Sequence, residues 1–217
     1  MKLYFKHFGE GRPLLLLHGL LGSSDNWLSH AKAWAAHFQV YIIDQRNHGH
    51  SPHHPVHTYD ELAQDLHELI EAEDIRHPYI LGHSMGGKTA MRFAQIFPEF
   101  LQKLVVVDMG IKAYKPLHEE IFAGLMAADV QHCTSRNASE EKLKPFVAEE
   151  STRQFLLKNL YWKEPDQLAW RFNLEALYNQ RLETTLALPH TVVNTPTLFL
   201  RGQRSNYITE EDYPDMR

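Results

Sequence analysis

The sequence has 217 residues, 43% hydrophobic and 11% aromatic, which is enough for one sizeable core and too apolar for a disordered chain. Its formal net charge of −5 argues against nucleic acid or an anionic membrane surface as the main partner. A single cysteine, Cys133, excludes an intrachain disulfide framework. No stretch is as long as a membrane span, and the first residues lack the apolar core of a secretory signal. We therefore expect a cytoplasmic protein that does not act at a membrane.

Short apolar runs alternate with helix-like stretches along most of the chain. The expected strands cover residues 2–8, 14–17, 40–43, 78–81, 104–107 and 195–200. Helices are expected over residues 27–38, after a capping box formed by Thr58 and Glu61, and from the turn at residue 84 to Phe97. Uniformly apolar strands that alternate with helices predict an α/β fold, a mostly parallel sheet with helices on both faces.

The pattern changes at residue 111, where buried-strand runs stop and only helices are expected as far as residue 194. Ser151 is predicted to cap one of these helices, and Pro165 and Asp166 to open another. A helical insertion between two strands of a parallel sheet is typical of a lid. We therefore predict a core over 1–110, a lid over 111–194 and a resumed core over 195–217. The lid is rich in large apolar side chains, most of them expected to pack it on the sheet and a few to line an acyl pocket.

The most informative motif is Gly82-His83-Ser84-Met85-Gly86, which lies between an expected strand and an expected helix. A serine in a G-x-S-x-G frame at such a turn is typical of a nucleophile elbow. The turn is sharp, so glycines are needed on both sides while the serine is pushed out at the tip. The helix N-terminus directs its partial positive charge at whatever reacts there. The motif predicts acyl transfer on Ser84.

The same turn also matches the phosphate-binding P-loop pattern, which ends at Lys88 and Thr89, with Asp108 as the acidic strand end that would hold magnesium. Two observations favour the hydrolase and leave a P-loop NTPase as the remote alternative. P-loops usually follow an early strand, whereas two buried strands precede this one. The His18-Gly19 loop also follows a buried strand, where an acyl-transfer enzyme needs its second oxyanion donor. The predicted donors are the N–H groups of Leu20 and Met85.

Three segments, residues 18–27, 44–51 and 82–87, resemble those of the α/β-hydrolase fold superfamily. The chain is most similar to its small bacterial carboxylesterases of the abhydrolase-domain esterase branch, and the resemblance runs over the whole length. It implies hydrolysis of short- to medium-chain acyl esters, or of acyl thioesters, without a cofactor. A second branch with similar motifs catalyses an elimination in menaquinone synthesis. A lyase of that type and a non-catalytic binding protein of this fold remain alternatives.

The resemblance places the triad acid in the loop after the strand at 197–200, but that loop has Asn206 and no carboxylate before Glu210. Asp108, at the end of the preceding strand, is the predicted replacement, because active-site groups gather at the carboxyl ends of parallel strands. Some family members also carry the acid on that strand. We interpret Asp44 as part of a turn held by its own polar side chains rather than as a catalytic group.

The triad order of this fold is nucleophile, acid, histidine, and no histidine follows residue 200. His118, His132 and His190 lie earlier, within the expected lid. We therefore expect the general base to be absent from these residues, and the chain to stop before one more strand, the histidine loop and a helix. Five histidines between residues 48 and 57 are not accompanied by cysteine or ordered carboxylates, so no metal site is predicted there. His83 is expected to face away from Ser84 and His18 to shape the oxyanion loop. The sequence gives no oligomeric state.

Overall fold

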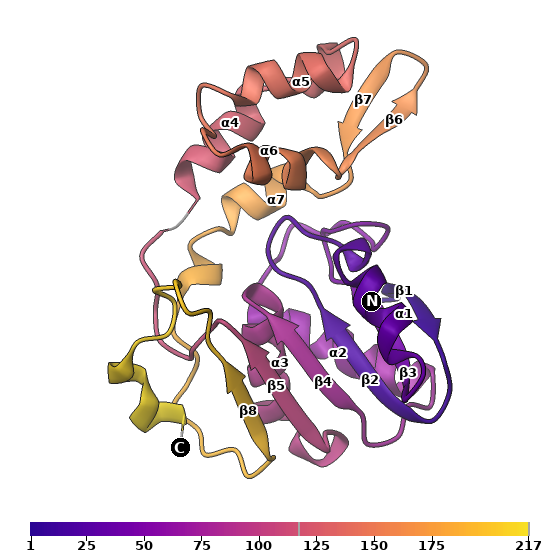
Figure 1. Ribbon diagram of the computed structural model, residues 1–217, viewed down its shortest axis with the longest axis vertical. Coiled ribbons are helices and arrows are strands. Elements are labelled where there is room, and N and C mark those ends of the chain that lie inside the picture. The colour runs from indigo at the N-terminus through magenta and orange to yellow at the C-terminus, as the bar shows by residue number, and fades with distance from the viewer. Residues whose placement is uncertain (117, 217) are drawn as a thin grey trace.

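A six-stranded sheet forms the centre of the computed structural model, which describes residues 1–116 and 118–216 (Figure 1). The strand order is β1-β3-β2-β4-β5-β8. Their bounds are Tyr4–Phe8 (β1), Arg12–Leu17 (β2), Phe38–Asp44 (β3), Tyr79–His83 (β4), Lys103–Val107 (β5) and Thr197–Leu200 (β8). Only β1 is antiparallel to its neighbour, and the other pairs are parallel. The predicted mostly parallel sheet is confirmed.

Helices cover both faces of this sheet, because alternate residues of each strand point to opposite sides. Leu15 and Leu17 of β2 pack with α2 (Tyr59–Ala72) and α3 (Met85–Ile96). Leu14 and Leu16 pack on the other side, with α1 (Leu28–Trp34). Thr58 caps α2 as predicted, since its hydroxyl accepts from the Glu61 N–H.

The helix expected over 27–38 is shorter than predicted. A 3-10 turn, η1 (Ser24–Trp27), precedes α1, and Phe38 already begins β3. The sheet also has an edge strand at its other end, since β8 pairs with β5 alone among the described residues. Two short 3-10 elements complete the core, η2 (Pro98–Phe100) and η5 (Glu210–Met216).

The segment between β5 and β8 stands over the carboxyl ends of the strands and has its own hydrophobic cluster (Figure 1). It contains α4 (Glu119–Ala127), η3 (Val130–His132), α5 (Arg136–Leu143), α6 (Glu150–Leu157), β6 (Leu160–Glu164), β7 (Gln167–Trp170), α7 (Leu174–Asn179) and η4 (Glu183–Thr185).

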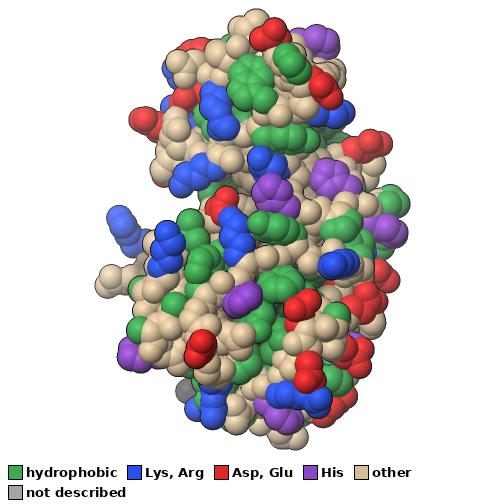
Figure 2. Space-filling model, turned by 90° about the vertical axis from the view of Figure 1, so that its right-hand side faces the viewer, with side chains coloured by type: hydrophobic (Ala, Val, Ile, Leu, Met, Phe, Trp, Pro, Cys, Tyr) green, Lys and Arg blue, Asp and Glu red, His purple; other side chains and the backbone are tan. Residues whose placement is uncertain are grey.

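Figure 2 shows one face of the molecule, with charges of both signs spread over it and an indentation where this lid meets the core. None of the described helices has the length and apolar character of a membrane span.

The expectation that the lid contains only helices is wrong, because β6 and β7 form an antiparallel hairpin. Asp166, predicted with Pro165 to open a helix, instead lies in the hairpin turn with a φ of 62°. Leu160 and Leu168 are buried and attach the hairpin to the lid cluster, whereas Trp162 is 48% exposed. The predicted cap is also displaced, since Glu149 rather than Ser151 precedes α6.

Candidate active site

Ser84 lies at the tip of a strained turn between β4 and α3. Its backbone φ of 52° and ψ of −118° are sparsely populated by residues with a side chain. A Cβ on Gly82 would lie 2.1 Å from the Gly86 carbonyl oxygen, and a Cβ on Gly86 would lie 2.6 Å from the Leu17 carbonyl oxygen. Both glycines are therefore required by close backbone packing, as predicted from the sharp turn of the G-x-S-x-G motif.

The loop after β2 packs directly on this turn. A Cβ on Gly19 would lie 3.2 Å from His83 Nδ1 and 3.4 Å from Ser84 Cβ. Leu20 and Met85 both line the cavity at Ser84. Within the described residues, neither the Leu20 N–H nor the Met85 N–H donates a hydrogen bond to a protein acceptor. The structure thus brings together the two residues that the sequence predicted as oxyanion donors and leaves both N–H groups free.

Asp108 follows β5 and lines the wider of two cavities that meet at Ser84, with a volume of about 480 Å³. Its N–H donates to the Leu200 carbonyl at 2.7 Å, and its Oδ1 accepts from the Gly202 N–H at 3.1 Å. The competing carboxylate Asp212 is used elsewhere, bound to Lys112 Nζ at 2.6 Å. Among the described residues, Asp108 is the carboxylate that lines a cavity together with Ser84.

No histidine among the described residues is hydrogen-bonded to Ser84 or to Asp108. His118 lines both cavities from the start of α4. His132 is paired with Asp129, and His190 lies near Asp215, 3.9 Å between Nδ1 and Oδ1. His83 is exposed and lines the wider cavity beside Ser84, so it borders the site instead of facing away from it.

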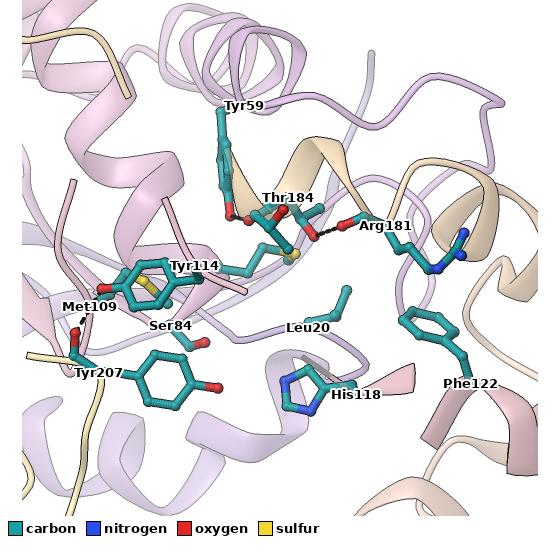
Figure 3. A pocket seen from close by; sticks show the side chains of 12 residues that line it. Leu20, Tyr59, Ser84, Met109, Tyr114, His118, Phe122, Arg181, Thr184 and Tyr207 are labelled. Carbon is teal, nitrogen blue, oxygen red and sulfur yellow. Dashed lines mark hydrogen bonds between the residues drawn. The ribbon is translucent and has the colours of Figure 1, made fainter. Parts of the chain in front are cut away.

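The narrower cavity has a volume of about 40 Å³ and extends from Ser84 between the core and the lid (Figure 3). In this view Ser84 lies between two tyrosines, Tyr114 and Tyr207, and the pair Leu20 and His118. Of the large apolar lid residues, Phe122 lines this cavity and Phe155 the wider one. The remaining lining groups could not be predicted from sequence patterns, because they come from segments far apart in the chain. These are Tyr59, Met109, Tyr114, Arg181, Thr184, Thr185 and Tyr207.

The side chain of Lys88, the residue that completes the P-loop pattern, is hydrogen-bonded to the segment after η4. It is fully buried, and its Nζ donates to the Leu186 carbonyl. The ammonium lies 5.5 Å from the Tyr59 ring centroid and 5.0 Å from that of Tyr114, and burial lowers the pKa of Lys88 to about 8. A P-loop lysine must reach the phosphates at the turn, so this geometry argues against phosphate binding.

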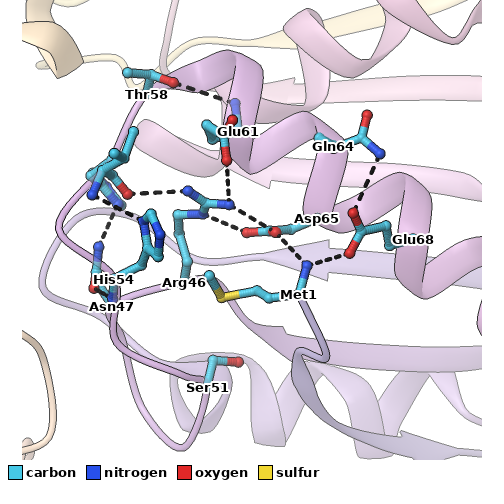
Figure 4. A network of polar contacts seen from close by, with 12 residues as sticks. Met1, Arg46, Asn47, Ser51, His54, Thr58, Glu61, Gln64, Asp65 and Glu68 are labelled. Atoms are coloured by element: carbon cyan, nitrogen blue, oxygen red, sulfur yellow. Dashed lines mark hydrogen bonds and ion pairs between the residues drawn. The ribbon is translucent and has the colours of Figure 1, made fainter.

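Asp44 and its neighbours form a self-contained polar turn. The Asp44 carboxylate accepts from the Ser24 N–H at 2.6 Å and the His50 N–H at 2.9 Å. Arg46 is bound to Asp65 and Glu61 of α2, in the network of Figure 4. These groups are fully used in holding the loop, as the sequence interpretation has it. The described residues contain no cluster of three or more His, Cys, Asp or Glu side chains placed to hold a metal.

A strained elbow serine at the carboxyl edge of a mostly parallel sheet, under a lid, is the arrangement of α/β-hydrolases. A family model described as alpha/beta hydrolase fold matches residues 12–121. The chain is 41% identical to the sn-1-specific diacylglycerol lipase ABHD11 of Danio rerio, over 96% of this chain and 68% of that protein. It is 33% identical to esterase YbfF of Escherichia coli, over 94% of this chain and 79% of that protein.

A solved structure described as a marine microorganism esterase superposes with a TM-score of 0.96 at 39% identity, covering 99% of this chain and 86% of that one. The chain belongs to the α/β-hydrolase fold family. Relatives named as an esterase and a lipase support a hydrolase of this fold, in agreement with the resemblance found in the sequence.

Proposed function

We propose that the protein is a cytoplasmic serine hydrolase that cleaves small acyl esters through an acyl-enzyme on Ser84. The observation that carries the proposal is the position of Ser84. It stands on a strained turn, beside the free N–H groups of Leu20 and Met85, in a cavity shared with Asp108. A nucleophilic serine, oxyanion donors and a carboxylate are three of the parts that acyl transfer requires, and the fourth is a general base.

In this mechanism the Ser84 hydroxyl attacks the ester carbonyl while a histidine base takes its proton. The carbonyl oxygen becomes an oxyanion, held by the N–H groups of Leu20 and Met85. The bond to the alcohol then breaks, the histidine returns the proton to the leaving oxygen, and an acyl group remains on Ser84. Water attacks this acyl-enzyme in the same way and releases the acid. Asp108 orients the histidine and stabilises its protonated form.

The general base is not identified among the described residues. We propose that it is a histidine outside these 217 residues, since no described histidine is bonded to Ser84 or Asp108. His118 is the internal competitor, because it lines both cavities. An assay of this chain with added imidazole separates the two, since free imidazole should restore ester turnover if the base is missing. Ordinary turnover without imidazole, lost in His118→Ala, would assign the base to His118 instead.

The proposed substrates are short- to medium-chain acyl esters or acyl thioesters. The cavity of about 40 Å³ beside the oxyanion donors would hold a short acyl group, and the wider cavity the rest of the substrate. Initial rates on p-nitrophenyl esters of increasing chain length and on acyl-CoA thioesters test this. Labelling by a fluorophosphonate, in a version that carries the histidine, tests the function itself. Absence of labelling and of turnover would favour the non-catalytic binding protein, and elimination without labelling the lyase.

A further inference from the structure

Leu21, the residue after the predicted oxyanion donor Leu20, has a left-handed backbone conformation with a φ of 59°. This region costs a residue with a side chain about 1–2 kcal/mol, so it persists only where the surroundings hold it. Leucine has no side-chain polar group that could compensate locally. The reason for this conformation must therefore lie in the contacts of Leu21 with other segments.

Both peptide groups of Leu21 are bound by side chains from distant parts of the chain. Its N–H donates to His48 Nε2 at 3.1 Å, and its carbonyl accepts from Asn159 Nδ2 at 2.9 Å. His48 belongs to the core turn after β3, whereas Asn159 belongs to the lid, between α6 and β6. His48 is 0% exposed and Asn159 is 3% exposed, so water does not compete for these bonds.

The bond from Leu21 requires a neutral imidazole with its lone pair on Nε2. His48 Nδ1 lies 2.9 Å from the Arg46 carbonyl oxygen, which accepts a proton but cannot donate one, and this fixes the hydrogen on Nδ1. Burial, with His18 and His57 as neighbours, lowers the pKa of His48 well below its ordinary value. Near neutral pH His48 is therefore a permanent acceptor for the Leu21 N–H.

The side chain of Leu21 is also held by the lid. It is 3% exposed and belongs to the hydrophobic cluster of the lid, with Phe122, Leu168 and Phe172. A residue of a core loop thus has its N–H fixed by the core, and its carbonyl and side chain fixed by the lid. Any movement of the lid away from the core would break two of these three attachments.

We propose that His48 and Asn159 are positioning residues that hold Leu21, and with it the Leu20 N–H, in the geometry that stabilises the oxyanion. The lid would then contribute to the chemical step as well as to substrate binding. This inference rests on the proposed function of Ser84 and Leu20. It differs from a purely structural role because an oxyanion donor acts mainly in the transition state, so its loss lowers kcat more than it changes KM.

The test compares Asn159→Leu and His48→Leu with the unchanged protein, in a version that carries the triad histidine. Each variant should lower kcat for p-nitrophenyl acetate about 10- to 100-fold, with KM changed less than about threefold. Binding of a boronic acid that mimics the tetrahedral intermediate should weaken by a similar factor. His48→Gln, whose amide oxygen can accept from the Leu21 N–H, should recover most of the activity. Asn159→Ala also removes the donor and serves if Asn159→Leu does not fold.

Asn173→Leu is the matched control. Asn173 also joins the lid to the core, through its Nδ2 to Asn47 Oδ1 at 3.2 Å, but it has no bond to the oxyanion loop. It should lower the melting temperature without the loss of kcat. An Asn159 variant with unchanged kcat, or with no greater loss than Asn173→Leu, would overturn the inference. Turnover that survives Ser84→Ala would instead overturn the proposed function, so the two failures are distinguishable.

Discussion

The two loops that meet at Ser84 are held in place in different ways. The elbow is fixed by its own neighbours, because Gly82 and Gly86 let the backbones of β4, α3 and the end of β2 pack within contact distance. The oxyanion loop is fixed by side chains of distant elements, His48 of the core and Asn159 of the lid. The proposed nucleophile, Ser84, is thus positioned by local sequence, whereas the loop that would stabilise the oxyanion depends on tertiary structure and on the lid.

The largest expected effect is on the elbow itself. Ser84→Ala should abolish ester hydrolysis and fluorophosphonate labelling in a version that carries the histidine, a loss on the order of 10⁶-fold in kcat, because no nucleophile remains. The fold should persist, since the alanine is smaller and the backbone is unchanged. Steady-state kinetics and a melting curve measure both. Tight magnesium-ATP binding that disappears in Lys88→Ala would instead revive the P-loop interpretation.

Asp108→Asn should come next, with a loss of kcat on the order of 10⁴-fold, because the histidine loses the carboxylate that orients it and stabilises its charge. The bond from the Gly202 N–H to the side chain would be kept by the amide oxygen, so stability should change little. Kinetics of Asp108→Asn beside those of Asp212→Asn and Glu210→Gln measure this. A nearly silent Asp108→Asn with a severe effect at Asp212 or Glu210 would place the acid in the other loop.

The features that the sequence predicted are the local ones, and those that it missed depend on long-range contacts. The sheet, the elbow and the position of Asp108 at a strand end rest on local patterns, namely apolar runs, a glycine-flanked serine and a polar residue after a strand. The hairpin β6–β7 was missed because its strands have only five and four residues and do not alternate regularly between buried and exposed positions, while Pro165 and Asp166 in its turn resemble a helix start. The contacts of Leu21 with His48 and Asn159 were also missed, since 27 and 138 residues separate the partners and no spacing rule connects them.

The third prediction concerns the effect of pH on the buried histidines in and beside the oxyanion loop. Burial lowers the pKa of His18 and of His48, and that of His57 to about 3. Between about pH 6.5 and the lowered values, the unfolded chain binds protons that the folded chain does not, so stability falls as pH falls. Each histidine contributes a slope of about 1.4 kcal/mol per pH unit.

Urea unfolding at several values between pH 7 and pH 4 measures this slope. His57→Phe should reduce it by about one histidine's share, 1.4 kcal/mol per pH unit, because the aromatic ring fills the site without binding a proton. His30→Phe is the control, since His30 is exposed and its replacement should leave the slope unchanged. Equal slopes in the His57 and His30 variants would mean that the buried histidines do not set the acid sensitivity.

The smallest expected effect concerns the packing of the elbow, which is tested by comparing substitutions at two adjacent glycines, Gly86 and Gly87. A Cβ at residue 86 would lie 2.6 Å from the Leu17 carbonyl oxygen and 2.7 Å from that of His18, so the backbone of the oxyanion loop would have to move. We expect Gly86→Ala to destabilise the protein by about 2–3 kcal/mol and to lower kcat as well. At residue 87 the nearest atom is the Gly82 carbonyl oxygen at 3.1 Å, and alanine favours the helix, so Gly87→Ala should change stability by less than about 1 kcal/mol. Chemical denaturation of the two variants measures the difference. If both are equally stable, close backbone packing does not hold the elbow, and the contrast with the oxyanion loop is lost.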